Sequence, residues 1–206
     1  MTSSSTRLLN LAAALHPLET ELDRLPVVGY RPSASNWSPA PAAVLVPILV
    51  GEDGGVVLTV RSRALTHHAG QVSLPGGGPQ DGEGFPLATA LREAGEEIGL
   101  PEQRVRPLGL LACCDTITAF RIVPVVALVP ASVNLKPNHT EVSETFTLPL
   151  DLVLDPDSYR RHEVLRGGDC FEAWSMKSGH RPVWGATAAI LREMALLATS
   201  GSSTEG

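Results

Sequence analysis

Three glutamates near the middle of the chain could bind a divalent metal ion. Glu93, Glu96 and Glu97 stand at positions i, i+3 and i+4, and this spacing places their carboxylates on one face of a helix. Carboxylates crowded in this way repel one another, but a hard cation such as Mg²⁺ takes oxygen ligands and would offset the repulsion. A solvated acidic face is the alternative interpretation. Arg92 lies four residues before Glu96 and can form an ion pair with it.

The segment around these glutamates has the signals of a short helix that follows a glycine turn. Pro86 suits the first position of a helix, and Gly99 suits the left-handed residue that ends one. The apolar residues between them recur at helical spacing: Leu87, Ala90, Leu91, Ala94 and Ile98. Residues 76–78 are three glycines, where backbone could approach a ligand closely. Gly95 costs about 1 kcal/mol relative to alanine inside a helix, which predicts close packing or a close approach to the backbone there.

This pattern resembles the Nudix box of the Nudix hydrolases. The box has a glycine, a spacer, an acid, a second spacer and then Arg-Glu-apolar-x-Glu-Glu-x-Gly-apolar. Residues 92–100 fit the last part, with alanine at the first apolar position. Counted from Gly78 the acid would fall at Gly84, but counted from Gly77 it falls at Glu83, and the following loop is one residue longer. The longer loop is similar to that of one branch of the family, the coenzyme A pyrophosphatases.

A second motif resembles the additional signature of the coenzyme A branch. Residues 58–62 read Leu-Thr-Val-Arg-Ser, and residues 68–77 carry His-Ala-Gly-Gln ahead of Leu-Pro-Gly-Gly. The chain departs from the signature at Thr66, where arginine is frequent, and at Leu74, where phenylalanine is usual. The missing arginine would weaken a contact to the 3′-phosphate of coenzyme A. Four nearby residues are candidate replacements: Arg61, Arg63, His67 and His68.

The resemblance implies a metal-dependent hydrolase that splits the diphosphate of coenzyme A, or of an acyl derivative, into 3′,5′-ADP and 4′-phosphopantetheine or its acyl form. Mg²⁺ or Mn²⁺ would neutralise the diphosphate and lower the pKa of a bound water. The implied metal ligands are Glu93, Glu97, a supporting Glu96 and a backbone carbonyl at Gly76 or Gly77. Glu96 or Glu141 would accept the proton, and Arg92 would hold the carboxylates in place. The implied catalytic residues are therefore Arg92, Glu96, Glu97 and Glu141.

Each candidate outside the box also has an ordinary structural interpretation. Arg61 can meet phosphate oxygens with two hydrogen bonds, or it can form a surface ion pair. His68 could contact a phosphate or only the box loop, and Gln71 could orient the glycine turn. Glu141 lies in a polar loop, from which Nudix enzymes often recruit a further ligand or base. The candidate substrate-binding residues are Arg61, Arg63, His68, Gln71 and Gly76.

Two other functions remain open at this point. One is the same hydrolysis on another nucleoside diphosphate derivative, such as ADP-ribose or a dinucleotide. The other is a Nudix-fold binding module without catalysis. Such modules tend to lose box carboxylates, whereas residues 92–97 keep the arginine and all three glutamates.

The fold class implied by the resemblance is α/β, a Nudix α/β/α sandwich with a mixed sheet and an N-terminal helical extension. Hydrophobic patterns predict helices within 3–25, 86–98 and 183–198 and strands at 42–50, 56–60, 105–113, 122–129 and 144–148. Pro47 argues that its strand is an edge or carries a bulge. Residues 151–159 suit a helix or a turn, and 172–176 a strand. The expected division is an extension and linker at 1–37, a catalytic domain at 38–199 and a fraying tail at 200–206.

The composition excludes several classes of partner. The chain has 206 residues and a formal charge of −6, and without a basic stripe we expect no nucleic-acid partner. The longest apolar run, 42–50, is too short to span a bilayer, so we expect no membrane partner. Three cysteines without a C-x-x-C pair and no visible signal peptide predict a reducing, cytoplasmic location. The expected partner is a small-molecule nucleotide similar to coenzyme A. A homodimer is the candidate oligomeric state.

Overall fold

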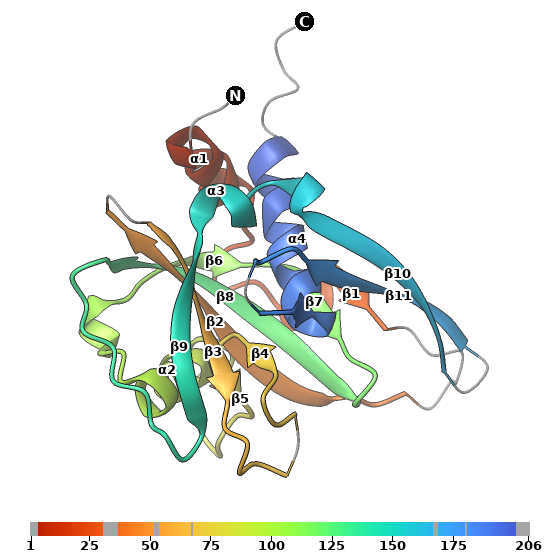
Figure 1. Ribbon diagram of the computed structural model, residues 1–206, viewed down its shortest axis with the longest axis horizontal. Coiled ribbons are helices and arrows are strands. Elements are labelled where there is room, and N and C mark those ends of the chain that lie inside the picture. The colour runs from red at the N-terminus through yellow and green to blue at the C-terminus, as the bar shows by residue number, and fades with distance from the viewer. Residues whose placement is uncertain are drawn as a thin grey trace, which may run out of the picture.

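In the part of the chain that the structure describes, a mixed sheet of nine strands forms the centre of the protein. The strands are β1 (Val27–Gly29), β2 (Ala40–Val50), β3 (Gly55–Arg61), β4 (Val72–Ser73), β5 (Gly76–Gly77), β6 (Arg106–Leu110), β7 (Cys113–Asp115), β8 (Phe120–Pro130) and β9 (Val142–Pro149). The computed structural model describes residues 4–30, 37–51, 54–66, 68–166, 169–179 and 181–200. Within them the main strand order is β1-β7-β8-β2-β3-β4, while β5, β6 and β9 pair with β2, β8 and β3 (Figure 1).

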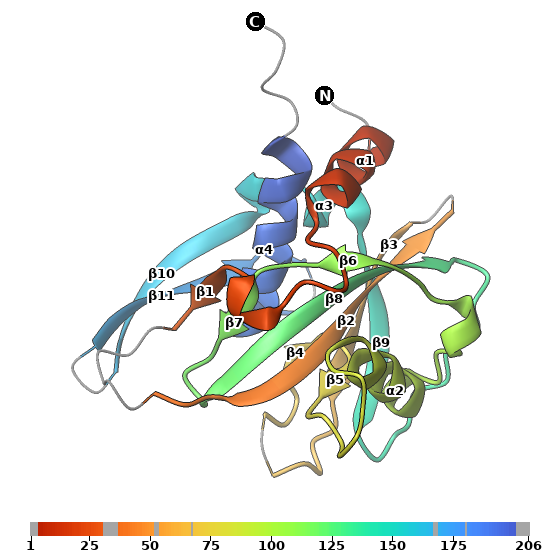
Figure 2. The same ribbon diagram turned by 180° about the vertical axis from the view of Figure 1, so that it is seen from behind.

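Helices cover both faces of this sheet, which confirms the expected α/β/α sandwich (Figures 1 and 2). They are α1 (Ser4–Ala14), α2 (Leu87–Ile98), α3 (Leu150–Val153) and α4 (Gly185–Ser200), with the 3₁₀ turns η1 (Leu22–Arg24), η2 (Glu102–Arg104) and η3 (Pro156–Ser158). Val46 and Ile48 of β2 join the buried cluster that contains α4, and Ala43 and Leu45 join the cluster that contains α2. Successive strand residues point to opposite faces, so β2 separates two cores.

The position of Pro47 differs from the prediction. Its strand β2 is central, because β8 pairs with it in parallel on one side and β5 and β3 pair with it on the other. The N–H of Leu45 points to the second side and donates to the carbonyl of Pro75, and residue 47 faces the same way. The ladder on that side has a gap between Val44, which pairs with β5, and Ile48, which pairs with β3. Proline therefore fits a central strand without costing a hydrogen bond.

Most of the predicted strands are confirmed, with one division. The predicted strands 42–50 and 56–60 form the antiparallel pair β2–β3, in which Ile48 lies opposite Val56. Glu52 and Asp53, whose residue types suit a turn between these strands, lie outside the described residues. The predicted strand 105–113 is two strands. Its first part, β6, pairs with β8, and β7 lies between β8 and the N-terminal strand β1.

A second, three-stranded sheet was predicted only in part, because the expected strand at 172–176 is confirmed within its middle strand and the other two strands were not predicted. It consists of β10 (Tyr159–Arg166), β11 (Asp169–Met176) and β12 (Val183–Trp184). Residues 151–159, predicted as a helix or turn, contain α3 and η3, and β10 follows directly. Strand β10 is rich in charged residues, so the hydrophobic pattern carried no signal for it. The predicted C-terminal helix begins two residues later than expected, because Val183 and Trp184 pair with β11.

The N-terminal segment takes part in both the core and the sheet. Leu11 of α1 is fully buried in the cluster that contains α4. The segment predicted as a linker contains β1, which pairs in parallel with β7 so that Val27 lies opposite Cys113. The division at residues 37 and 199 stays a prediction, and residues 201–206 lie outside the described part. In the described chain no helix has the length and apolar character needed to cross a membrane.

Candidate active site

Helix α2 carries the candidate ligands, and its ends follow the sequence signals. Gly99 ends the helix in the left-handed conformation, with φ +63°, and its N–H bonds to the last turn. Ala90, Ala94 and Ile98 are fully buried against the sheet, so the acidic residues are turned toward the loops. The close packing expected at Gly95 is not found, and a close approach to its backbone stays a prediction. Gly95 is exposed, and a Cβ there would lie 3.7 Å from the nearest atom, the carbonyl oxygen of Leu100.

Glu97 is the most protected carboxylate of the box, with 3% of the residue exposed. Its Oε2 accepts a hydrogen bond of 3.2 Å from the backbone N–H of Gly76, and its Oε1 lies 3.7 Å from Nη1 of Arg61. Burial raises the pKa of the Glu97 carboxyl to about 7, although the bond from Gly76 and the charge of Arg61 oppose the shift. A nearby cation would favour the charged form of this group.

Arg92 forms ion pairs with two glutamates of the box and with one glutamate of the loop that precedes α2. Its Nε lies 2.9 Å from Oε1 of Glu83. Its Nη1 lies 2.9 Å from Oε1 of Glu93 and 2.8 Å from Oε2 of Glu96. Its Nη2 donates to the carbonyl of Gly78 over 2.9 Å. Arg92 therefore contacts Glu83, the acid that counting from Gly77 selects, together with Glu93 and Glu96. The roles of these residues in the reaction stay predictions.

Glu93 lies directly against the glycine turn. A Cβ on Gly77 would fall 2.4 Å from Oε1 of Glu93, so no side chain fits at residue 77 while Glu93 keeps this position. Burial raises the pKa of the Glu93 carboxyl, Arg92 opposes that rise, and the charges of Glu96 and Glu141 add to it. The backbone of Gly77 and the carboxylate of Glu93 are therefore neighbours, as expected for a shared ion site.

The loop that carries Glu141 docks on both α2 and β3. The N–H of Asn138 donates to the carbonyl of Glu97 over 2.9 Å, and the N–H of Ser62 donates to the carbonyl of Glu141 over 2.7 Å. The side-chain amide of Asn138 lies 3.3 Å from Oε1 of Glu141. The negative charge of Glu141 contributes to the raised pKa of the carboxyls of both Glu93 and Glu97. Asn138 anchors this loop, and no motif in the sequence marks it.

The segment of the second motif is tied to the end of β3. The N–H of Arg61 donates to the carbonyl of Gln71, and the N–H of Gly70 donates back to the carbonyl of Arg61. Nδ1 of His68 lies 2.9 Å from Oε1 of Gln71, so Gln71 holds His68 rather than the glycine turn. Nε of Arg61 is buried without a hydrogen-bond partner in the described chain. An anion at this position would satisfy it.

The remaining substrate candidates lie apart from this arrangement. Arg63 and Thr66 are exposed, and Arg63 forms no ion pair with the described residues. His67 lies outside the described residues. A cavity of about 650 Å³ lies at the opposite end of β3 and is lined by α1, Gly54 and Pro149; it contains none of the candidate residues. The chemistry of the site is therefore that of the α2 carboxylates and Arg61.

The three glutamates do not converge as the sequence predicted. Glu96 is exposed and turned toward Arg92, and in the described residues no three acidic, histidine or cysteine side chains are gathered closely enough to hold an ion. Arg92 and Arg61 instead offset the repulsion between the carboxylates. The donors nevertheless fit Mg²⁺ or Mn²⁺, because Glu93 and Glu97 offer hard oxygen ligands. Burial raises the pKa of both carboxyls, and a bound cation would favour their charged forms.

The family model of the NUDIX domain matches residues 39–166. The chain belongs to the Nudix hydrolase family. It is 37% identical to the uncharacterized Nudix hydrolase NudL of Klebsiella pneumoniae strain 342 over 179 residues, which cover 87% of this chain and 93% of the relative. It is 40% identical to the NudL of Escherichia fergusonii over 155 residues, with 75% and 81% covered.

Solved structures give more distant likenesses to this Nudix protein. The Nudix hydrolase RenU from M. smegmatis has 26% identity and a TM-score of 0.47, with 57% of this chain and 74% of that chain covered. The NUDIX domain of NrtR from Shewanella oneidensis, solved with ADP ribose, has 20% identity and a TM-score of 0.44, with 61% and 81% covered. Membership of the Nudix family rests on the domain match and the NudL relatives.

Proposed function

We propose that this Nudix hydrolase cleaves the diphosphate bond of coenzyme A or an acyl derivative, with Mg²⁺ or Mn²⁺ as cofactor. Its products would be 3′,5′-ADP and 4′-phosphopantetheine or the acyl form. Family membership supports hydrolysis of a nucleoside diphosphate derivative. The choice of coenzyme A rests on the second motif, residues 58–77, and on its position beside the box.

The observation that carries this choice is the contact of Arg61 with the box. Arg61 belongs to the coenzyme A motif, and its guanidinium lies 3.7 Å from Glu97 of the Nudix box. The same guanidinium has a buried Nε without a partner, and the motif residues Gly70 and Gln71 bond to its backbone. A planar guanidinium that is partly held by a carboxylate can still offer two donors to a phosphate.

Each residue of the site would have a specific role in binding the metal ion, binding the substrate or transferring a proton. Glu93 and Glu97 would hold the metal ion, with the backbone at Gly77 beside them. Glu96, which pairs with Arg92, would have to turn away from it to add a further oxygen. The ion would supply charge neutralisation to the diphosphate and activation of the attacking water. Arg61 would bind a phosphate oxygen, and Arg92 would keep Glu93 and Glu96 in position. Glu141, whose negative charge raises the pKa of the carboxyls of Glu93 and Glu97, would be the proton acceptor, with Glu96 as the second candidate.

Product analysis tests this function directly. Free coenzyme A, acetyl-coenzyme A, ADP-ribose and a diadenosine polyphosphate would each be incubated with protein and Mg²⁺, and the products separated by chromatography and mass spectrometry. We expect 3′,5′-ADP from the coenzyme A compounds and the highest kcat/KM for them. Faster turnover of ADP-ribose would reassign the substrate, and no turnover of any compound would favour a binding module. Glu97→Gln is the inactive control, and its circular dichroism should match the wild type.

A second comparison asks whether the exposed Thr66 leaves the 3′-phosphate without a contact. Coenzyme A and dephospho-coenzyme A differ only by that phosphate, and a charge-assisted hydrogen bond contributes roughly 1.5–3 kcal/mol. If Arg61, Arg63 or the histidines replace the missing arginine, coenzyme A should be preferred by about tenfold or more in kcat/KM, and Thr66→Arg should add little. Equal values for the two compounds, with a preference created by Thr66→Arg, would show that no replacement exists.

A further inference from the structure

Strand β10 is a free edge of the second sheet. It pairs with β11 along its whole length, from Tyr159 opposite Met176 to Arg166 opposite Asp169. In the described chain it is the last strand of the order β10-β11-β12. Figures 1 and 2 show the β10–β11 hairpin extending away from the sandwich, with β10 on its outer side. The unpaired N–H and C=O groups of such an edge can pair with another strand.

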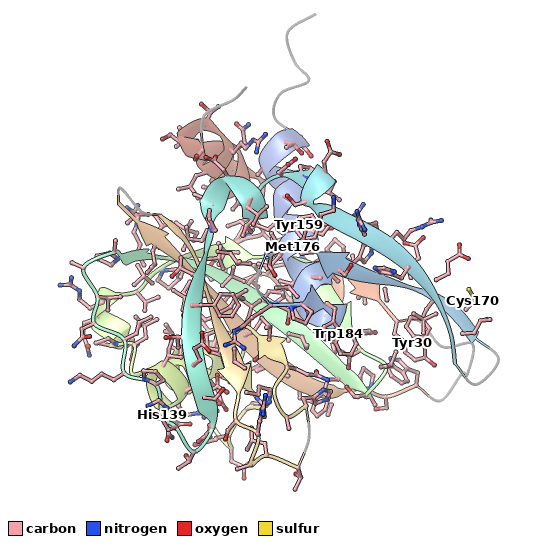
Figure 3. All side chains as sticks on the ribbon, viewed as in Figure 1. Tyr30, His139, Tyr159, Cys170, Met176 and Trp184 are labelled. Atoms are coloured by element: carbon pink, nitrogen blue, oxygen red, sulfur yellow. The ribbon has the colours of Figure 1, made fainter. Side chains whose placement is uncertain are left out.

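The side chains of β10 fall on two faces of the hairpin. Every second residue shares the face that turns toward α4, where Tyr159 is buried. The residues of this face are Tyr159, Arg161, Glu163 and Leu165. Figure 3 shows Tyr159 and Met176 at the inner end of the hairpin and Cys170 near its tip. Leu165 lies opposite Cys170 near this tip and is 79% exposed. It is a large apolar side chain that nothing in the described chain covers.

Symmetry restricts how two copies of β10 can pair. An antiparallel pair related by a two-fold axis places one residue opposite its own copy, and facing residues then share one face of the sheet. A pair centred on Arg161 sets two arginines against each other, and a pair centred on Glu163 sets two glutamates against each other. A pair centred on His162 sets each Arg161 opposite Glu163 of the second copy. Opposite charges directly across a sheet are favourable and like charges are not.

We propose that two copies of this chain associate through their β10 edges, antiparallel and centred on His162. Within one copy Arg161 lies 2.8 Å from Glu172 and 3.4 Å from Glu163. All three side chains are exposed, so Arg161 and Glu163 can turn to form two reciprocal pairs between the copies while Arg161 keeps Glu172 beside it. Leu165 of each copy comes opposite Tyr159 of the other and loses part of its exposed apolar surface. The two three-stranded sheets become one sheet of six strands. A single strand edge buries less area than the roughly 1,600 Å² of a standard interface, so we expect a weak dimer that depends on protein concentration.

Sedimentation equilibrium of the full chain, from low micromolar to millimolar protein, tests the association. Arg161→Glu and Glu163→Arg should each weaken the dimer by about tenfold or more, and the double variant should restore it. Arg160→Glu is the control for charge on the same edge, because it lies opposite Val164 of the second copy. Glu172→Gln is the control for the ion pair that Arg161 forms within its own copy. Unfolding curves of each variant show that the hairpin still folds. A monomer at every concentration, or equal effects of Arg160→Glu and Arg161→Glu, would overturn the proposal.

Cross-linking tests the register by a separate readout. In a Cys170→Ser background, which removes the exposed thiol of the hairpin, His162→Cys places two thiols opposite each other. Directly paired antiparallel residues have Cα atoms about 4.5–5.5 Å apart, within the range of a disulfide. Mild oxidation should therefore give a covalent dimer with His162→Cys, and much less with Arg160→Cys. Equal cross-linking of both variants, or none with His162→Cys, would contradict the register.

Discussion

Nε of Arg92 lies 2.9 Å from Oε1 of Glu83. This contact joins the first residue of the Arg-Glu part of the box to the loop that precedes the helix. Glu83 also accepts hydrogen bonds from Thr89 and from the backbone of Gln80. These bonds, the one from Arg92 first, lower the pKa of the Glu83 carboxyl to about 2. Glu83 is therefore a positioning residue that fixes Arg92, and Arg92 in turn contacts Glu93 and Glu96.

Glu83→Gln should reduce activity without removing a metal ligand. The neutral amide no longer pairs with Arg92, and the loss of a partner that orients ligands typically costs about 10- to 100-fold in activity or metal affinity. We expect this loss in kcat/KM, together with a higher Mg²⁺ requirement. The control is Glu102→Gln, because Glu102 is exposed on η2 and forms no ion pair in the described chain. An unchanged Mg²⁺ titration would show that Glu83 does not act through the ligands.

Gly77→Ala should damage the site, whereas Gly78→Ala should not. The added Cβ at residue 77 would lie 2.4 Å from Oε1 of Glu93, so the carboxylate must move. At residue 78 the nearest atom to an added Cβ is 4.0 Å away. We expect Gly77→Ala to weaken metal binding, measured by calorimetric titration with Mn²⁺, while Gly78→Ala binds as the wild type does. Equal binding by the two variants would separate Glu93 from the metal site.

Gly95→Ala should stabilise the protein. Gly95 is exposed inside α2, and an added Cβ would make only ordinary contact, 3.7 Å from the carbonyl oxygen of Leu100. Alanine in a helix interior is favoured over glycine by about 0.5–1 kcal/mol, so the free energy of unfolding in urea should rise by about this amount. A fall in stability would mean that the helix cannot accept the methyl group. A rise in stability with lost activity would show that substrate approaches the backbone at this point.

The stability of the metal-free protein should fall as pH rises. Burial raises the pKa of Glu97 from 4.5 to about 7, so the folded state holds its proton more tightly than the unfolded state. The stabilisation from this group is complete below about pH 4.5 and is lost as pH rises through about 7. A shift of this size corresponds to roughly 3 kcal/mol. Urea denaturation with a chelator at pH 5.5 and pH 8 should show the fall in wild type, and Glu97→Gln should reduce it. Added Mg²⁺ should restore stability at pH 8.

Glu141→Gln should distinguish a base from a ligand. A base acts in the chemical step, so its loss should lower kcat and remove the acid limb of the pH profile of kcat. A ligand acts on the ion, so its loss should raise the Mg²⁺ concentration needed for half-maximal rate. Thr140→Val is the control in the same loop, because it removes a hydroxyl bond to Asn138 but no charge. Unchanged kinetics in both tests would leave Glu141 as an anchor of the loop only.

The sequence by itself determined helix α2 and the family of the protein. The start near Pro86, the left-handed end at Gly99, the buried stripe and the Arg92–Glu96 pair all depend on residues within one or two turns of each other. Such relations between residues close in sequence follow from the helical repeat, so they can be predicted without knowledge of the tertiary structure. For the same reason the strands with apolar runs, β2 and β8, were predicted at nearly their full length.

Only the tertiary structure decided which distant groups meet at this helix. Glu141 comes to Glu93 and Glu97 because its loop bonds to the end of α2 and to Ser62, over a separation that no local pattern encodes. Pro47 fits a central strand because β5 and β3 leave a gap beside it. Strand β10 exists because β11 pairs with it, although its charged residues carry no hydrophobic signal. Hydrogen bonds between distant segments, and burial that only the folded chain creates, decide these features.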